Sequence, residues 1–185
     1  MSLLDREAVP GTVIWITGLS GAGKSTIARR THELLKAAKP NVVLLDGDAF
    51  RAIIGDDLRH NSNDRLLNAY RIARFCKFLS DQGIDVVCAT MSLFDECHEW
   101  NRQNIRRYFE VYLRVTFEVV VKRDPKGLYK RARQGLESGV VGVDLPFHEP
   151  KQPHLVIDNS SDLSTFDDIA QYVIKAAFVG QPLPE

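Results

Sequence analysis

The sequence predicts a three-layer α/β/α sandwich built on a parallel five-stranded sheet. Short apolar runs rich in β-branched residues alternate with segments of helical periodicity along the whole chain. The run at 84–89 is apolar almost throughout, which is typical of a parallel strand that is buried on both faces. A glycine-rich stretch also joins the first strand directly to the first helix. This order of elements favours parallel strands connected by helices that cover both faces of the sheet.

Five strands are expected, because five segments each hold a cluster of Val, Ile, Leu or aromatic residues. They lie at 13–17, 41–45, 84–89, 109–115 and 155–158. Helical periodicity predicts helices at 25–38, 49–54, 65–82, 95–107, 116–123, 127–134 and 164–177. The polar segment 55–63 lacks periodicity and is expected to be a loop, and 135–153, rich in glycine and proline, is expected to be a long active-site loop.

Composition limits the classes of function. A length of 185 residues suffices for one α/β domain, and residues 1–185 are expected to form a single one. Lys+Arg and Asp+Glu each number 24, so the chain lacks the basic field that gathers nucleic acid. No apolar run has the length of a membrane span, and the three cysteines show no C-x-x-C spacing. We therefore expect a cytoplasmic protein with reduced thiols and with no nucleic-acid or membrane partner.

The glycine-rich stretch after the first strand matches the phosphate-binding P-loop motif, G-x-x-x-x-G-K-[ST]. Its glycines let successive backbone N–H groups point at one phosphate, and the N-terminus of the following helix favours an anion. Lys24 is expected at the β- and γ-phosphates, and the Ser25 hydroxyl is expected to ligate Mg²⁺. A purely structural turn is the alternative, but strand, motif and helix coincide. The predicted contacts with a nucleoside triphosphate are Gly18, Leu19, Ser20, Gly21, Ala22, Gly23, Lys24, Ser25 and Thr26.

Two aspartates follow the second strand as Asp46-Gly47-Asp48. Residues at the carboxyl end of a parallel strand lie at the edge of the sheet where ligands bind. Phosphoryl transfer to a hydroxyl needs one group that accepts the proton and one that holds Mg²⁺, and carboxylates suit both tasks. A solvated turn is the alternative. We expect both aspartates to be catalytic, and the residues alone leave open which of them is the base.

Cationic side chains flank the two predicted loops. Arg51 and Arg65 lie on either side of the first loop, and planar guanidinium groups suit the anionic part of an acceptor. The basic run 122–133 is either a solvated helix face or part of a lid, expected at about 123–153, that supplies cations to the transferred phosphoryl group. The guanine-specific [NT]-K-x-D motif fails at Val121, which argues against a GTPase, and the five histidines have no metal-ligand spacing.

Together these stretches resemble the adenylylsulfate kinase family from residue 13 to about residue 158. The match includes V-I-W-I-T-G-L-S-G at 13–21, L-D-G-D followed by Arg51, Asp64-Arg65 with Asn68, and R-D-P-K-G-L-Y at 123–129. The resemblance implies a P-loop kinase, working as a homodimer. It implies that this kinase transfers the γ-phosphate of ATP, with Mg²⁺, to the ribose 3′-hydroxyl of adenosine 5′-phosphosulfate.

The resemblance also implies roles for single residues. Asp46 resembles the base that takes the proton of the acceptor hydroxyl, and Asp48 is expected at Mg²⁺ and at the acceptor. The other expected contacts are those of Arg51, Arg65 and Asn68 with the acceptor nucleotide, of Lys126 with its phosphosulfate, and of Arg131 with ATP.

The departures from the family gather at the acceptor. Two phenylalanines hold the adenine in the family, and His60 and Val140 occupy their positions here. The family's I-S-P-Y-R is replaced by M-S-L-F-D, of which Met91, Ser92 and Leu93 are expected at the acceptor. An aromatic stack on a base contributes ~1–3 kcal/mol, so adenine is expected to bind more weakly.

These departures leave two alternatives to an ordinary adenylylsulfate kinase. A subgroup that resembles this family phosphorylates cytidine diphosphoramidate, whose smaller base and uncharged nitrogen end would fit the altered positions. A non-catalytic nucleotide-binding module on the same fold is the second alternative. The intact P-loop and aspartate pair argue against the module, because a protein without catalysis needs neither a base nor a magnesium site.

Overall fold

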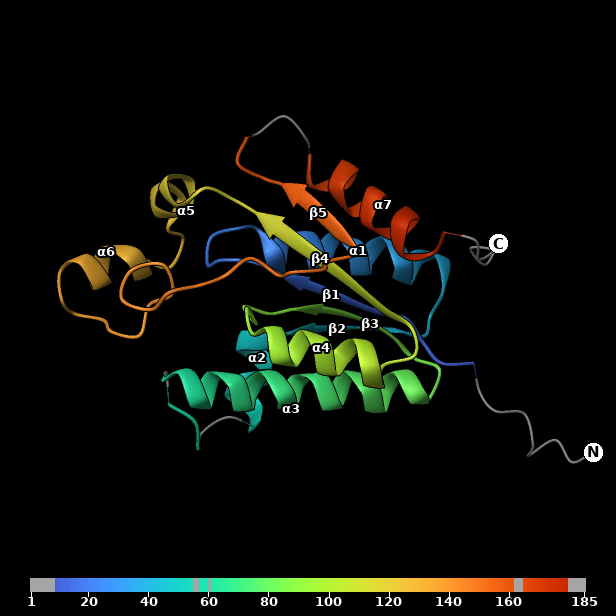
Figure 1. The fold of residues 1–185 in the computed structure, drawn as a ribbon. Coiled ribbons are helices and arrows are strands. Elements are labelled where there is room, and N and C mark those ends of the chain that lie inside the picture. The colour runs from blue at the N-terminus through green and yellow to red at the C-terminus, as the bar shows by residue number, and fades with distance from the viewer. Residues whose placement is uncertain (1–8, 55–56, 60, 162–164, 180–185) are drawn as a thin grey trace, which may run out of the picture.

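A computed structural model describes residues 9–54, 57–59, 61–161 and 165–179. Its strands are β1 (Val13–Thr17), β2 (Val42–Asp46), β3 (Asp85–Ala89), β4 (Tyr108–Arg114) and β5 (Leu155–Asp158). They form one sheet in the order β2-β3-β1-β4-β5, and every neighbouring pair is parallel (Figure 1). The predicted parallel sheet is confirmed, and each strand lies within a residue of its expected position.

The helices also follow the prediction, with shifted ends. They are α1 (Lys24–Ala38), α2 (Gly47–Ile54), α3 (Ser62–Asp81), α4 (Asp95–Asn104), α5 (Phe117–Arg123), α6 (Leu128–Arg133) and α7 (Phe166–Ala177). Helix α3 begins inside the predicted polar loop because the side chain of Asn61 accepts a hydrogen bond from the backbone N–H of Asp64 and so caps its first turn. Helix α4 ends three residues before the predicted end, at Asn104, because the buried Ile105 takes an extended conformation.

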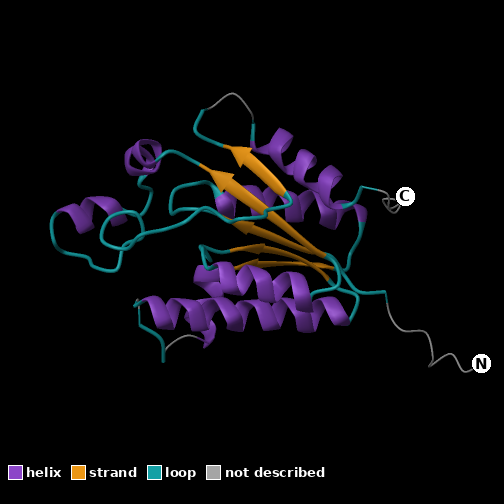
Figure 2. Ribbon diagram, viewed as in Figure 1, coloured by secondary structure: helices purple, strands orange, loops and turns teal. Residues whose placement is uncertain are grey.

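Helices cover both faces of the sheet (Figure 2). The central strand β1 alternates between them: Ile14 and Ile16 belong to the core that includes α1 and α7, whereas Val13 and Trp15 belong to the core that includes α2, α3 and α4. All five residues of β1 are buried. Burial on both faces explains why this strand, like β3, consists largely of apolar residues. The predicted three-layer sandwich is thereby confirmed.

The loops that follow β1 and β2 lie at the same edge of the sheet. The P-loop leaves the end of β1, and the aspartate pair leaves the end of β2. Between α5 and β5 the chain leaves the layers, forms α6, and returns beside β4 (Figure 1). No helix within the described residues combines the length and the apolar composition that crossing a bilayer requires.

Candidate active site

A cavity of about 670 Å³ lies at this edge of the sheet. Its volume is in the range of small-molecule sites. The predicted residues that line it are Ser20, Gly21, Gly23, Lys24, Ser25, Thr26, Asp46, Asp48, Arg51, Arg65, Asn68, Met91, Lys126, Arg131 and Val140. Residues from the P-loop, the aspartate pair, α3, the segment after β3 and the predicted lid therefore meet around one space.

Five predicted site residues within the described part of the chain do not line the cavity. Gly18, Leu19 and Ala22 belong to the P-loop, and the side chains of Leu19 and Ala22 are buried in the core. Ser92 and Leu93 follow Met91 but are not part of the wall, and Ser92 is buried. His60 lies outside the described residues.

The P-loop has the backbone conformation that its glycines allow. Gly21 and Gly23 have φ angles of 79° and 95°, in the left-handed region that favours glycine. A Cβ atom on Gly23 would lie 2.9 Å from the amide nitrogen of Asn159, which donates a hydrogen bond of 2.9 Å to the carbonyl of Ala22. Asn159 thus holds the P-loop from the end of β5 and leaves no room for a side chain at Gly23.

Lys24 is half-buried, and its ammonium donates a hydrogen bond of 2.8 Å to the carbonyl of Leu19. Burial, together with nearby Lys126, lowers the pKa of Lys24 to about 8, although Asp48 and Asp46 act in the opposite direction. The positive charge of Lys24 is therefore only partly compensated by the protein. A polyanion in the cavity would supply the compensation.

Asp46 is bound to the P-loop. Its Oδ2 accepts a hydrogen bond of 2.6 Å from the hydroxyl of Ser25, and its Oδ1 accepts one of 3.0 Å from the backbone N–H of Asp48. Burial by itself raises the pKa of Asp46, but these hydrogen bonds outweigh it and leave the pKa below its usual value. Asp46 is therefore held as a carboxylate beside the hydroxyl that the motif assigns to Mg²⁺.

Asp48 faces the lid instead. It forms an ion pair with Lys126, and both side chains are largely exposed, at 74% for Asp48 and 62% for Lys126. Within the described residues no group of three His, Cys, Asp or Glu side chains is placed to hold a metal ion. Ser25 and Asp46 nevertheless fit Mg²⁺, because this ion is usually held by one or two protein oxygens together with substrate phosphates.

The two predicted acceptor arginines bind backbone carbonyls. Arg51 donates to the carbonyls of Leu58 and Arg59, at 2.7 and 2.6 Å, and Arg65 donates to the carbonyl of Gly139 at 2.8 Å. Both still line the cavity. They fix the loop before α3 and the lid turn in place, and they also direct positive charge at the cavity.

Val140 combines two environments. It is only 2% exposed and belongs to the core that includes α1 and α7, and it also lines the cavity. Asp144 accepts hydrogen bonds from the backbone N–H groups of Gly139 and Val140, which fixes this turn. Phe147, an aromatic residue of the lid that could have stacked on a base in place of the missing ring, is not among the described residues that line the cavity. Val140 therefore contributes an aliphatic surface where the family resemblance implies an aromatic ring.

Some wall residues were not predicted from the sequence. They are Thr90, Arg123, Pro125, Leu128, Glu137, Ser138, Asn159 and Phe166, together with Gly47, Ala69 and Ala89. Asn159 directly follows the last strand, so the rule that ligands lie at the carboxyl ends of strands could have found it. Phe166 begins α7 and is brought to the P-loop only by the packing of α7 on α1. Nothing in the local sequence marks it.

Comparison with known proteins identifies the family. The family model described as adenylylsulphate kinase matches residues 10–158, which include the P-loop, the aspartate pair and the lid. This chain belongs to the adenylylsulfate kinase family. Members of this family are ATP-dependent kinases that transfer phosphate to a hydroxyl group, and the chain is an enzyme of that class.

Individual members of the family are similar to this chain over most of its length. The cytidine diphosphoramidate kinase of Campylobacter jejuni is 40% identical over 148 residues, which cover 80% of this chain and 86% of that protein. The adenylyl-sulfate kinase of Pseudomonas aeruginosa is also 40% identical, over 152 residues that cover 81% and 78% of the two chains. The solved APS kinase CysC of Mycobacterium tuberculosis, in complex with AMPPNP and APS, has a TM-score of 0.84 and 32% identity, covering 90% of this chain and 97% of its own.

Binding of ATP is expected to be linked to proton uptake at Lys24. With a pKa of about 8, Lys24 is neutral in about half of the free molecules at pH 8, and bound phosphates raise this pKa again. Calorimetry in buffers of different ionisation enthalpy is expected to show uptake of about half a proton per ATP at that pH and close to none at about pH 6.5. Lys24→Arg, whose charge is permanent, should show no such difference. Equal uptake by both proteins would contradict the role given to Lys24.

Proposed function

We propose that this kinase uses MgATP to phosphorylate the ribose 3′-hydroxyl of a small nucleotide such as adenosine 5′-phosphosulfate. The observation that carries the proposal is the convergence of two charged groups on one cavity. Lys24 and the Ser25–Asp46 pair form the end that suits a triphosphate, and the Asp48–Lys126 pair lies beside them. A donor phosphate and an acceptor hydroxyl can therefore be held side by side.

The contacts favour roles for the two aspartates opposite to those that the resemblance implies. Asp46 accepts from Ser25, so we assign it to the side of Mg²⁺, which neutralises phosphate charge when bound. Asp48 is exposed and reaches toward the lid, so we assign it as the base that accepts the proton of the acceptor hydroxyl. Lys126 is the exposed ion-pair partner of Asp48. We expect its ammonium to separate from Asp48 and to bind an anionic group of the acceptor when the acceptor is present.

The lid supports the same arrangement. We assign residues 1–185 to one kinase domain in which about 123–153 cover the cavity. The guanidinium of Arg131 donates to the carbonyl of Lys126 at 2.8 Å and pairs with Glu137, which braces this segment from inside. Arg131 also lines the cavity and is assigned to ATP. Exclusion of water by such a lid protects the donor phosphate from hydrolysis.

Cytidine diphosphoramidate is a second candidate acceptor, favoured by the aliphatic wall at Val140. A ring stacked on a base contributes ~1–3 kcal/mol, and Val140 offers no ring. Adenine therefore gains less here than in a site with two phenylalanines. The homodimer and the cytoplasmic location also remain part of this proposal, and three buried, unpaired cysteines agree with a reducing compartment.

A side-by-side acceptor assay tests the proposal. ADP release is measured with adenosine 5′-phosphosulfate and with cytidine diphosphoramidate, and we expect adenosine 5′-phosphosulfate to have the higher Michaelis constant. His60→Phe with Val140→Phe is expected to improve its use by about tenfold or more. A micromolar Michaelis constant for adenosine 5′-phosphosulfate in the unmodified protein would refute the altered acceptor site. Tight ATP binding without turnover of any acceptor would instead indicate a non-catalytic module.

A further inference from the structure

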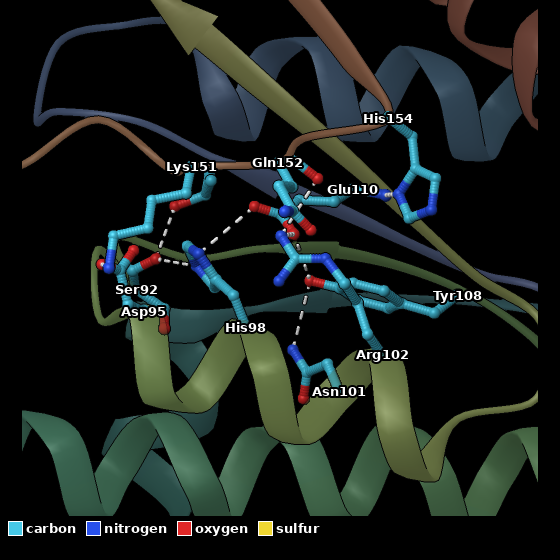
Figure 3. A network of polar contacts seen from close by, with 11 residues as sticks. Ser92, Asp95, His98, Asn101, Arg102, Tyr108, Glu110, Lys151, Gln152 and His154 are labelled. Carbon is cyan, nitrogen blue, oxygen red and sulfur yellow. Dashed lines mark hydrogen bonds and ion pairs between the residues drawn. The ribbon is translucent and has the colours of Figure 1, made fainter.

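A cluster of polar side chains lies between α4 and β4 (Figure 3). His98, from α4, and Glu110, from β4, are 1% and 0% exposed. Neither lines the cavity. Burying two ionisable groups in an apolar layer is unfavourable unless they are paired and hydrogen-bonded, so their position calls for a function.

His98 holds the segment that supplies part of the wall. Its Nε2 lies 2.6 Å from the carbonyl oxygen of Ser92, which also accepts a hydrogen bond of 2.9 Å from the hydroxyl of Thr17. A carbonyl only accepts, so Nε2 carries a proton. Thr17 ends β1 directly before the P-loop, and Met91, next to Ser92, lines the cavity. One carbonyl therefore joins the wall to the start of the P-loop.

The other ring nitrogen of His98 faces Glu110. His98 Nδ1 lies 3.2 Å from Glu110 Oε1, and neither atom has another hydrogen-bond partner among the residues that the structure describes. Because Nε2 already donates, a hydrogen bond between Nδ1 and Oε1 requires exactly one further proton, shared by the two groups. Without that proton, a lone pair on Nδ1 would face a carboxylate oxygen, and the contact would become repulsive.

The second oxygen of Glu110 and its backbone connect this pair to the lid. Oε2 accepts from Arg102 at 2.8 Å and from the hydroxyl of Tyr108 at 3.3 Å. Arg102 also donates to the carbonyl of Gln152, and the backbone N–H of Glu110 donates to His154 Nδ1. Gln152 and His154 lie where the chain returns from the lid to β5. A change in the protonation of the His98–Glu110 pair can therefore affect both the wall segment at Ser92 and the end of the lid at Gln152 and His154.

We propose that His98 and Glu110 are positioning residues, which share one proton and thereby hold residues 90–94 against the P-loop for binding of the acceptor. This inference rests on the proposed function for its effect on turnover, but its structural part does not need catalysis. Loss of the shared proton at alkaline pH loosens the wall, and its presence at lower pH keeps the wall in place.

Other titratable and charged groups surround the pair. They are Asp95, Cys97 and Arg102 from α4, Cys76 from α3, Tyr108 from β4, His154 before β5, and Lys151, which pairs with Asp95. Burial raises the pKa of Glu110 to about 7, although Arg102 opposes this, and burial lowers the pKa of His98. Burial also raises the pKa of Cys97 to about 12 and lowers the pKa of His154 below its usual value. With the pKa of Glu110 at about 7, the pair loses its shared proton as pH rises past neutrality.

The structural part is tested on the ligand-free protein. The chain has two methionines, Met1 and Met91, so the ¹³C-methyl signal of Met91 reports on the wall. Between about pH 5.5 and pH 9 this signal is expected to shift with one midpoint near neutrality. In Glu110→Gln the amide donates to His98 at every pH, and the shift should disappear. Glu99→Gln, an exposed change on the same helix, should retain it.

Kinetics test the consequence for catalysis. In the unmodified enzyme, the Michaelis constant for the acceptor is expected to rise about fivefold as pH increases across this midpoint. Glu110→Gln should keep the lower value at every pH. The Michaelis constant for ATP should stay unchanged in both proteins. His98→Ala should have the higher Michaelis constant at every pH. His98→Gln, which can still donate to the carbonyl of Ser92, should bring the constant part of the way back to the lower value. His98→Gln also provides a variant without the titration if Glu110→Gln fails to fold.

Each outcome decides one claim. A pH-dependent shift of the Met91 signal that persists in both Glu110→Gln and His98→Gln overturns the proposal that His98 and Glu110 share a proton. A Met91 shift that disappears as expected, together with an acceptor Michaelis constant that does not depend on pH, overturns the positioning role. Absence of turnover with every acceptor refutes the proposed function, while the methyl signal still tests the pair.

Discussion

Lys24→Ala is expected to lower the rate of phosphoryl transfer by about a thousandfold or more, with the fold intact. Lys24 is the P-loop cation of the cavity, and charge that stabilises a transferred phosphoryl group accounts for several kcal/mol of the barrier. The hydrogen bond that Lys24 makes within the described residues, to the carbonyl of Leu19, lies in the loop, and Lys24 belongs to neither of the two cores, so we expect its removal to leave the cores intact.

Single-turnover measurement of ADP formation, with the melting temperature alongside, tests this expectation. Lys36→Ala is the matched control, because Lys36 is an exposed lysine on the same helix that donates to the carbonyl of Pro40 and is not among the described residues that line the cavity. Its turnover should equal that of the unmodified protein. If Lys24→Ala keeps more than about a tenth of the unmodified turnover, the P-loop is not the donor site.

Asp46→Asn and Asp48→Asn are expected to impair turnover in different ways. Asp46 accepts from Ser25, so an amide there weakens the magnesium side and should raise the Mg²⁺ concentration for half-maximal rate by about tenfold or more. Asp48 faces the acceptor side, so an amide there cannot take the hydroxyl proton and should lower turnover by about 10²–10⁴-fold at saturating Mg²⁺.

Magnesium titrations of the rate separate the two effects, with Asp81→Asn, an exposed change at the end of α3, as the control. A large loss of turnover in Asp46→Asn that excess Mg²⁺ does not restore, with a mild effect of Asp48→Asn, would reverse the assignment. It would then return to Asp46 the role of base that the family resemblance implies.

The parts of the site that the sequence could predict are those that local sequence determines. The P-loop glycines and Lys24 act through a continuous stretch between one strand and one helix, so their spacing alone specifies the geometry. The strands could be placed because burial on both faces requires continuous apolar runs. The start of α3 was less predictable, since the Asn61 cap lies in a polar segment that also reads as a loop.

The parts that could not be predicted depend on contacts between distant elements. The difference between Asp46 and Asp48 arises because one aspartate meets Ser25 and the other meets Lys126, 78 residues away in the chain. Similarly, His98 and Glu110 look like an ordinary surface histidine and a strand glutamate until α4 packs over β4. Periodicity assigns such residues to elements but does not say which of their partners lie opposite.

The path of the lid has a consequence for how enzymes of this kind diverge. The chain leaves the layers after α5, which follows β4, and returns at β5, whose neighbour in the sheet is β4. Substitutions at its exposed positions leave the strand register unchanged, whereas Tyr129 and Val140 are buried in the core that includes Ile14 and Ile16 of β1. Acceptor preference can therefore drift among descendants of one ancestor through the exposed positions of this segment, while the P-loop, which lies outside it, is inherited unchanged.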